Sequence, residues 1–285
     1  MAQPLWAENR DLTGNLISSG SDSLNTLMRA WAVLFKQDNP EINIQIHAGG
    51  SSTAAVALAQ STAHLGPMSR TMNPAERRRF EQLHGYTPTA IPVAIEALAV
   101  FVHRHNPLNT IAWQQLEPLF SAEPLCSEQE KIRYWHQLGV RGDLGARLIT
   151  SYGRNTASGT YGFLKSHLLC GADFRADLHE LPGAAAVIQA VALSPSGIGI
   201  AGKQHATASV KELPFNGEQT AAESGLQRML YVYVNSHPEH GIAAKEQAFL
   251  RMILSEPGQQ LVAQYGYVPL PAEQRKLALG ALDGP

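Results

Sequence analysis

The sequence has no long apolar run, few cysteines and no excess of charge of either sign. Of its 285 residues, 44% are apolar and 16% are charged, and the formal net charge is -2. No segment reaches the about 18 consecutive apolar residues that a membrane-spanning helix requires. The nearly balanced charges provide no general positive field that would hold nucleic acid, so we expect no nucleic-acid partner. The sequence therefore predicts a globular chain of about two domains.

The two cysteines and the N-terminus give limited information about the compartment. Cys126 and Cys170 are too few for a disulfide framework, and they lack the Cys-x-x-Cys spacing of metal and redox sites. Two free thiols and a single bridge between them are both compatible with the sequence. No basic and then apolar leader follows Met1, which fits a cytoplasmic protein or an exported chain whose signal peptide is not present.

Sequence motifs of several enzymes and metal sites are also missing. The chain contains neither the Gly-x-Ser-x-Gly elbow of serine hydrolases nor the Gly-x-x-x-x-Gly-Lys-Ser/Thr loop of nucleotide triphosphatases. Two histidine pairs, His103 with His105 and His237 with His240, lack the His-Glu-x-x-His spacing of a helical zinc site. We therefore expect no metal, no cofactor and no catalysis. A serine-dependent esterase or phosphotransferase is the enzyme alternative, because catalytic triads are assembled in space.

Three hydroxyl- and glycine-rich segments are present, at 20–23, 49–53 and 154–160, and each lies between a predicted strand and a predicted helix. Apolar residues recur at helical spacing over 23–37, and they alternate with polar residues over 42–47, which is typical of a strand. The start of a helix carries unpaired N–H groups and the positive end of its dipole, so hydroxyls and glycines there let an anion approach closely. Three such starts and an arginine would surround a tetrahedral anion.

The alternation of strands and helices predicts an α/β fold with ligands at the carboxyl ends of strands. About 100 residues separate the second and third segments. A cleft between two domains is the simplest way to bring such distant segments to one ligand. We predict a discontinuous first domain, residues 1–99 plus 204–285, and a second domain, residues 100–203. Two extended crossings, near 98–102 and 200–205, would form the hinge.

Further motifs accompany these three segments in a fixed order: Trp31, Ser69-Arg70, Ile95-Glu96-Ala97-Leu98-Ala99-Val100, Asn106-Pro107-Leu108, Tyr231-Val232-Tyr233-Val234-Asn235, Gly258-Gln259-Gln260 and Gly266-Tyr267-Val268-Pro269-Leu270. Over nearly the whole chain, the set resembles the periplasmic phosphate-binding proteins of phosphate-specific ABC importers. The resemblance implies the two-domain periplasmic-binding-protein fold, with inorganic phosphate bound in the interdomain cleft. It also implies a periplasmic location and delivery of phosphate to an ABC transporter permease in the inner membrane. We expect the protein to be a monomer.

Eight residues of this chain match the anion-contacting positions of that family: Asp22, Ser23, Ser51, Ser69, Arg154, Ser158, Gly159 and Thr160. Arg70 is a ninth candidate ligand, although an arginine beside the ligand loop can also bridge the domains. Arg154 would supply a charge-assisted, bidentate contact to the anion. The hydroxyls and backbone N–H groups would complete the shell, because burying a polyanion without donors costs several kcal/mol. The Ser69-Arg70 pair is characteristic of one branch of the family.

Two departures from the family pattern bear on specificity. Some members carry an aspartate where this chain has Ser69, and that carboxylate accepts the phosphate proton and repels fully ionised sulfate. We hypothesise that Asp22 takes over as proton acceptor, with Glu96 as a weaker candidate. At 197–201 the family often has a tyrosine after the second glycine, and this chain has Ile200. Sulfate, molybdate and organic phosphates are the alternative ligands.

Overall fold

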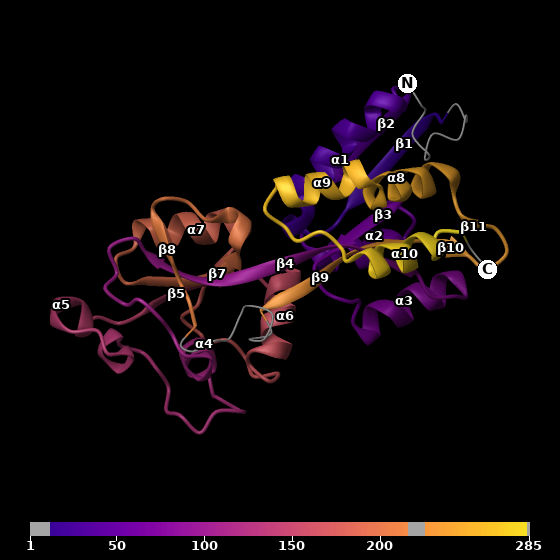
Figure 1. The fold of residues 1–285 in the computed structure, drawn as a ribbon. Helices are drawn as coiled ribbons and strands as arrows, with labels where there is room; N and C mark the ends of the chain where they lie inside the picture. The colour runs from indigo at the N-terminus through magenta and orange to yellow at the C-terminus, as the bar shows by residue number, and fades with distance from the viewer. Residues whose placement is uncertain (1–11, 216–225, 284–285) are drawn as a thin grey trace. The chain divides into compact units, whose positions relative to one another are not determined.

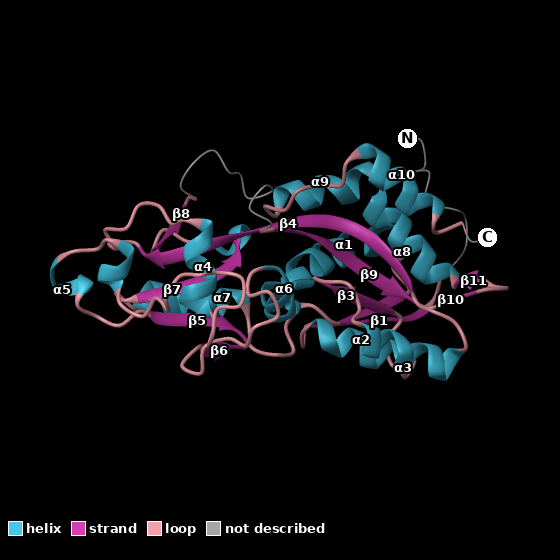
Figure 2. Cartoon of the chain, turned by 90° about the horizontal axis from the view of Figure 1, so that it is seen from below, coloured by secondary structure: helices cyan, strands magenta, loops and turns pink. Residues whose placement is uncertain are grey.

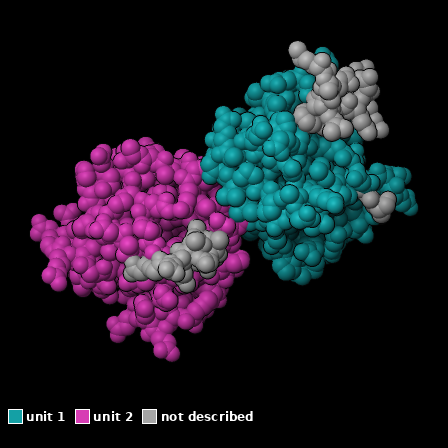
Figure 3. Space-filling model, in the orientation of Figure 1, with its two compact units in different colours: residues 1–95, 229–285 teal, residues 96–228 magenta. Residues whose placement is uncertain are grey.

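The computed structural model describes residues 12–215 and 226–283, and the chain divides into two compact units. Unit 1 contains Met1–Ile95 and Met229–Pro285, and unit 2 contains Glu96–Arg228 (Figure 3). The chain passes between the units within two strands, β4 (Thr89–His103) and β9 (Gln227–Val234). Among the described residues, no helix combines the length and the apolar character needed to cross a bilayer.

Unit 1 is an α/β unit whose strands lie in the order β2-β1-β3-β9-β4 (Figure 1). Its other elements are β1 (Gly14–Ser19), the 3-10 helix η1 (Asp22–Leu24), α1 (Asn25–Asp38), β2 (Ile42–His47), α2 (Ser51–Ala59), β3 (Leu65–Met68), α3 (Pro74–His84), β10 (Ser236–His237), β11 (Gly241–Ile242), α8 (Ala244–Leu254), α9 (Glu256–Gln264) and α10 (Ala272–Gly280). β1 pairs in parallel with β2 and β3, and β3 pairs antiparallel with β9.

Two apolar cores hold the helices of unit 1 to its sheet. The apolar face of α1 packs with α8 and α9 in one core, where the rings of Phe35 and Phe249 meet edge to face at 5.2 Å. The indole N–H of Trp31 donates to the carbonyl of Gly258 at 2.9 Å, which joins α1 to α9. α2 and α3 bury the second core on the opposite face (Figure 2). The helical spacing at 23–37 and the alternation at 42–47 therefore predicted these elements correctly.

Unit 2 is also α/β, with the strand order β4-β7-β5-β6 and β8 paired to β4. Its further elements are η2 (Trp113–Gln115), α4 (Leu116–Phe120), η3 (Trp135–Leu138), α5 (Gly142–Gly145), β5 (Thr150–Arg154), α6 (Gly159–His167), β6 (His179–Leu181), α7 (Ala184–Leu193), β7 (Gly197–Gly202), η4 (Lys203–His205) and β8 (Val210–Leu213). β5 runs parallel to β6 and β7, whereas β7 is antiparallel to β4. The predicted α/β class is confirmed in both units.

The second boundary between the units differs from the predicted one. Sequence patterns suggested that the chain returns to the first domain at residue 204, but β8 pairs antiparallel with the second half of β4, from Val100 opposite Leu213 to His103 opposite Val210. Leu213 and Leu226 are buried in the core of unit 2. The predicted crossing at 200–205 therefore lies inside unit 2, and the chain leaves this unit at Arg228.

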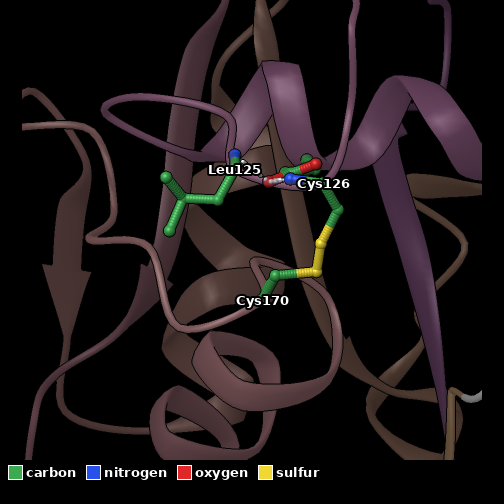
Figure 4. Close-up of a disulfide and its surroundings, with 4 residues drawn as sticks. Leu125, Cys126 and Cys170 are labelled. Atoms are coloured by element: carbon green, nitrogen blue, oxygen red, sulfur yellow. Dashed lines mark hydrogen bonds between the residues drawn. A yellow bond between two sulfur atoms is a disulfide. The ribbon is translucent and has the colours of Figure 1, made fainter.

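Cys126 and Cys170 form a disulfide within unit 2, so the structure selects the bridged alternative (Figure 4). Their Cα atoms are 6.2 Å apart, within the usual range for a bridge. The Oε1 atom of Glu117 accepts hydrogen bonds from the N–H groups of Leu125, at 2.5 Å, and Cys126, at 2.9 Å. The bridge and Glu117 thus hold the segment after α4 next to the residues that follow α6.

Candidate functional site

Three segments of unit 1 bring a cluster of serine hydroxyls together. Ser21 follows β1, Ser51 begins α2 and Ser69 follows β3. The Ser21 hydroxyl donates to Ser69 Oγ at 3.0 Å, and Ser51 Oγ lies 3.2 Å from the same atom. The backbone N–H of Ser69 donates to Ser51 Oγ at 3.0 Å. All three side chains are buried. The carboxyl ends of β1 and β3 and the start of α2 therefore form one neutral hydroxyl cluster, defined by these three serines.

The glycines beside this cluster are explained by backbone packing. A Cβ atom on Gly20 would lie 2.1 Å from the carbonyl oxygen of Pro67, and the N–H of Gly50 donates to the carbonyl of Gly20 at 2.8 Å. Gly50 also adopts a φ of 112°, which L side chains rarely adopt. Glycine is required here because the loops that contain Gly20, Gly50 and Pro67 pack closely against one another. These glycines are therefore not independent signs of an anion.

Asp22 and Ser23 begin the 3-10 helix η1, which precedes α1. Ser23 is buried, and its carbonyl accepts a hydrogen bond from the Tyr267 hydroxyl at 2.5 Å. Asp22 is partly exposed and directly follows Ser21 of the hydroxyl cluster. The carboxylate that we proposed as proton acceptor is therefore adjacent in sequence to one member of this cluster.

Arg70, predicted as an anion contact, has a carboxylate partner in unit 1. Its two terminal nitrogens each lie 2.6 Å from one oxygen of Glu76, and Nη2 also donates to Ser52 Oγ at 3.1 Å. Glu76 in turn accepts from the N–H of Asn73 at 2.9 Å in the capping box of α3. Arg70 therefore joins the first turns of α2 and α3, a structural role that the sequence did not reveal.

The third hydroxyl-rich segment lies in unit 2, where Arg154 ends β5 and Ser158 caps α6. Ser158 Oγ accepts the N–H of Thr160 at 3.1 Å, as an N-cap serine does. The Arg154 guanidinium donates from Nε to Leu181 O at 3.3 Å and from Nη2 to Pro182 O at 2.8 Å. These side chains are at most 4% exposed. The two carbonyls orient a buried cation close in sequence to a helix start.

A buried ion pair in unit 2 was not recognised from the sequence. Arg228 donates to Glu96 Oε2 from Nε at 2.8 Å and from Nη2 at 2.6 Å, and Gln204 Nε2 donates to Glu96 Oε1 at 2.6 Å. Because both carboxylate oxygens of Glu96 already accept hydrogen bonds, this residue is a poor acceptor for a phosphate proton. Asp22 therefore remains our proposed acceptor of the phosphate proton. Arg228 belongs to none of the recognised motifs, so its sequence position alone gave no signal.

The second histidine pair lies in a surface turn of unit 1. Ligand atoms of His237, Glu239 and His240 all lie within 4.8 Å of one another. The N–H of Glu239 donates to Nδ1 of His237 at 3.1 Å, and the two imidazole rings stack at 4.6 Å. The lone pair of Nδ1 is thus already used, and Glu239 and His240 are exposed, as is common for such groups without a metal. We assign no role to this cluster.

The chain has the features of a ligand-binding fold. It forms two α/β units, two strands continue from one unit into the other, and hydrogen-bond donors lie at the starts of helices. A PBP superfamily domain model matches residues 7–257. The phosphate-binding protein PstS of Pseudomonas aeruginosa is 44% identical over 293 aligned residues, which cover 99% of this chain and 91% of that protein. The chain therefore belongs to the PBP superfamily, in the family of the phosphate-binding proteins PstS, as its motifs predicted.

More distant proteins share the fold. The PstS of Bacillus subtilis is 24% identical over 90% of this chain and 81% of that protein. A crystal structure of a putative phosphate ABC transporter substrate-binding protein with bound phosphate, from Clostridium perfringens, matches with a TM-score of 0.77 and 21% identity, over 90% of this chain and 100% of that one. An ABC-type phosphate transport receptor from Vibrio cholerae matches with a TM-score of 0.70 and 20% identity, over 90% and 100% of the two chains. These similarities agree with the fold expected from the sequence.

Proposed function

We propose that this protein binds inorganic phosphate and delivers it to an ABC-type importer, without catalysis and without a cofactor. The names of the PstS relatives and the phosphate in the Clostridium perfringens structure support this ligand. The observation that carries the proposal is the buried Arg154, which ends β5 four residues before the Ser158 cap of α6. A guanidinium near a helix N-terminus is a combination that favours an oxyanion.

In unit 2, the anion would lie at the first turn of α6. Gly159 begins this helix, so its N–H group is among those without a partner inside the helix, whereas the N–H of Thr160 already donates to Ser158 Oγ and leaves the Thr160 hydroxyl as the donor of that residue. Arg154, oriented by the carbonyls of Leu181 and Pro182, would add a charge-assisted contact. This half-site would therefore provide the positive potential that a phosphate dianion requires.

In unit 1, the hydroxyl cluster would contact the other side of the ion. A serine hydroxyl donates one hydrogen bond and accepts two, so the mutual contacts of Ser21, Ser51 and Ser69 can rearrange to donate to phosphate oxygens. Asp22 would accept the phosphate proton and disfavour sulfate, which has no proton at neutral pH. Ser23 and Arg70 would support the segments that carry these groups. Closure of the two units around the ion would complete the shell, because each unit alone offers only part of the donors.

Cellular location belongs to the same proposal. We infer that the protein works outside the cytoplasm, in the periplasm, as a monomer that meets a membrane permease. The Cys126–Cys170 disulfide supports this location, because such bridges persist in oxidising compartments.

Isothermal titration calorimetry with phosphate, sulfate and molybdate at two pH values tests the ligand. We expect one phosphate per chain, with weaker binding of sulfate and molybdate. A phosphate Kd above about 1 mM would contradict the proposal, since that affinity corresponds to a weak complex. A parallel assay with phosphoesters should give no turnover. Hydrolysis that depends on one of the buried serines would instead support the esterase alternative.

A further inference from the structure

Glu96 and Arg228 are the residues at which the chain enters and leaves unit 2. They are 132 positions apart in sequence, yet their side chains form an ion pair with a 2.6 Å contact, and both are at most 2% exposed. Glu96 lies on β4 and Arg228 lies on β9, the two strands that continue into unit 1. The pair therefore ties together the two strand segments through which the chain crosses.

Arg228 also contacts the first turn of α6. Its Nη2 donates to Thr160 Oγ1 at 2.8 Å, and its guanidinium carbon lies 5.4 Å from the centroid of the Phe163 ring. Residues three apart in a helix share a face, so both contacts lie on one side of α6. The guanidinium is thus held between the Glu96 carboxylate and the helix start that we propose as half of the phosphate site.

The hydrogen bond from Arg228 restricts the directions open to the hydroxyl proton of Thr160. A guanidinium only donates, so Thr160 Oγ1 is the acceptor in this contact and its own proton must point elsewhere. We propose that Arg228, held by Glu96, is a positioning residue that commits the Thr160 hydroxyl to donate to the bound anion. Through this contact, the strands β4 and β9, which continue into unit 1, are coupled to the first turn of α6. The inference rests on the proposed function and deepens it.

The surroundings of the pair fit this role. A cation at a helix N-terminus is unfavourable by itself, and the Glu96 carboxylate compensates its charge. Gln204 holds the second carboxylate oxygen, and a Cβ on Gly202 would lie 2.4 Å from that oxygen. Burying two charges is stabilising only when their geometry is good and their remaining hydrogen bonds are satisfied. The side chain of Glu96 is therefore fixed by several neighbours, and Arg228 is fixed through it.

A double-mutant cycle tests the coupling between Arg228 and Thr160. Phosphate Kd is measured by calorimetry for Arg228→Met, Thr160→Val and the double variant. We expect Arg228→Met to weaken phosphate binding by about tenfold, the size of a charge-assisted hydrogen bond, and to add little to Thr160→Val. Losses that simply add in the double variant would show that Arg228 does not act through Thr160, and would overturn the inference.

Two further variants separate positioning from general loss of stability. Arg175→Met is the matched control, because Arg175 is a buried arginine of unit 2 that pairs with Asp177 at 2.5 Å and contacts Ser151 at 3.1 Å. We expect it to lower the melting temperature with a phosphate Kd within about twofold of wild type. Glu96→Met with Arg228→Met replaces the whole ion pair by apolar groups, which proteins often tolerate. The double variant should fold and yet bind phosphate as weakly as Arg228→Met. Phosphate affinity equal to that of wild type would overturn the inference.

Hydrogen exchange of the ligand-free protein tests the same contact without phosphate. Amides of residues 158–163 should exchange faster in Arg228→Met than in wild type or Arg175→Met, because the N-terminal part of α6 loses the contacts that Arg228 makes with Thr160 and Phe163. Equal exchange in all three proteins would overturn the inference. If wild-type protein binds no phosphate, the proposed function fails, and this exchange difference alone decides whether Arg228 positions α6.

Discussion

The two proposed half-sites differ in charge. Unit 1 offers the neutral hydroxyls of Ser21, Ser51 and Ser69, whereas unit 2 offers a buried guanidinium, Arg154, near a helix start. Charge-assisted hydrogen bonds are about twice as strong as neutral ones. We therefore expect unit 2 to supply most of the affinity, the hydroxyl cluster to supply shape complementarity, and Asp22 to recognise the phosphate proton.

The largest expected effect concerns the stability of unit 2. Removing its disulfide with Cys126→Ser and Cys170→Ser should lower the free energy of unfolding by about 2–4 kcal/mol, because the bridge closes a long loop in the unfolded chain. Denaturant unfolding measures this loss. Phosphate affinity of the folded double variant should change little, and a large loss of affinity would show that the bridge shapes the site directly.

Arg154→Met should weaken phosphate binding by about 100-fold, because it removes a buried charge and its contacts with the anion. Calorimetric titration gives the affinity, and Arg141→Met, which changes an exposed arginine of the same unit, is the control. An effect no larger than that of the control would reverse the comparison between the two units.

Ser69→Ala should weaken phosphate binding by about tenfold or less, since one neutral hydrogen bond contributes about 0.5–1.5 kcal/mol. The same titration measures it, with Ser166→Ala, a change on the exposed side of α6, as control. If Ser69→Ala costs more affinity than Arg154→Met, the hydroxyl cluster and not the guanidinium dominates binding.

Asp22→Asn should narrow the preference for phosphate over sulfate by several-fold, because the amide no longer repels sulfate. Competition titrations of both ions at pH 7 give the ratio of affinities. Unchanged exclusion of sulfate would refute Asp22 as the proton acceptor, and the partner of the phosphate proton would then have to be a serine hydroxyl.

The smallest expected effect concerns the pH dependence of stability, and it follows from a comparison of two buried glutamates, one in each unit. Glu96 of unit 2 is paired with Arg228, whereas Glu246 of unit 1 is 6% exposed and its Oε2 has no hydrogen-bond partner within the described ranges. Burial raises the pKa of Glu246 above its usual value of 4.5. The native state then binds this proton more tightly than the unfolded state, so stability falls as the pH rises from 4.5 through the raised pKa.

Glu246→Gln removes this loss of stability at higher pH. We compare the melting temperature of the variant minus that of wild type at two pH values. This difference should therefore be larger at pH 8 than at pH 4, by a few degrees. Thermal denaturation at both pH values measures the difference. A difference of the opposite sign would mean that the Glu246 carboxylate is stabilised in the folded protein.

The sequence predicted those parts of the molecule that are local in the chain. Helix α1 follows from the spacing of its apolar residues, and the start of α6 follows from three consecutive residues, Ser158-Gly159-Thr160. The ordered motifs also identified the family. These features depend on neighbours within a few positions, and a single sequence displays them directly.

Features that depend on distant strand pairing were missed. The antiparallel partnership of β8 with β4 places 210–213 in unit 2, although no local pattern marks that segment. The contact between Glu96 and Arg228 likewise exists only because two distant strands meet. Arg70 shows the same limit on a smaller scale, since its partner Glu76 lies six positions away across a loop. The motifs identified candidate residues, but the hydrogen-bond and ion-pair partners of these residues depend on the three-dimensional fold.

A crystal structure of the protein grown with phosphate tests the central claim most directly. The account predicts one phosphate ion with oxygens within hydrogen-bond distance of the Arg154 guanidinium, the Thr160 hydroxyl and at least one hydroxyl of the Ser21, Ser51 and Ser69 cluster. A phosphate ion bound elsewhere, or one that contacts neither Arg154 nor the first turn of α6, would contradict it.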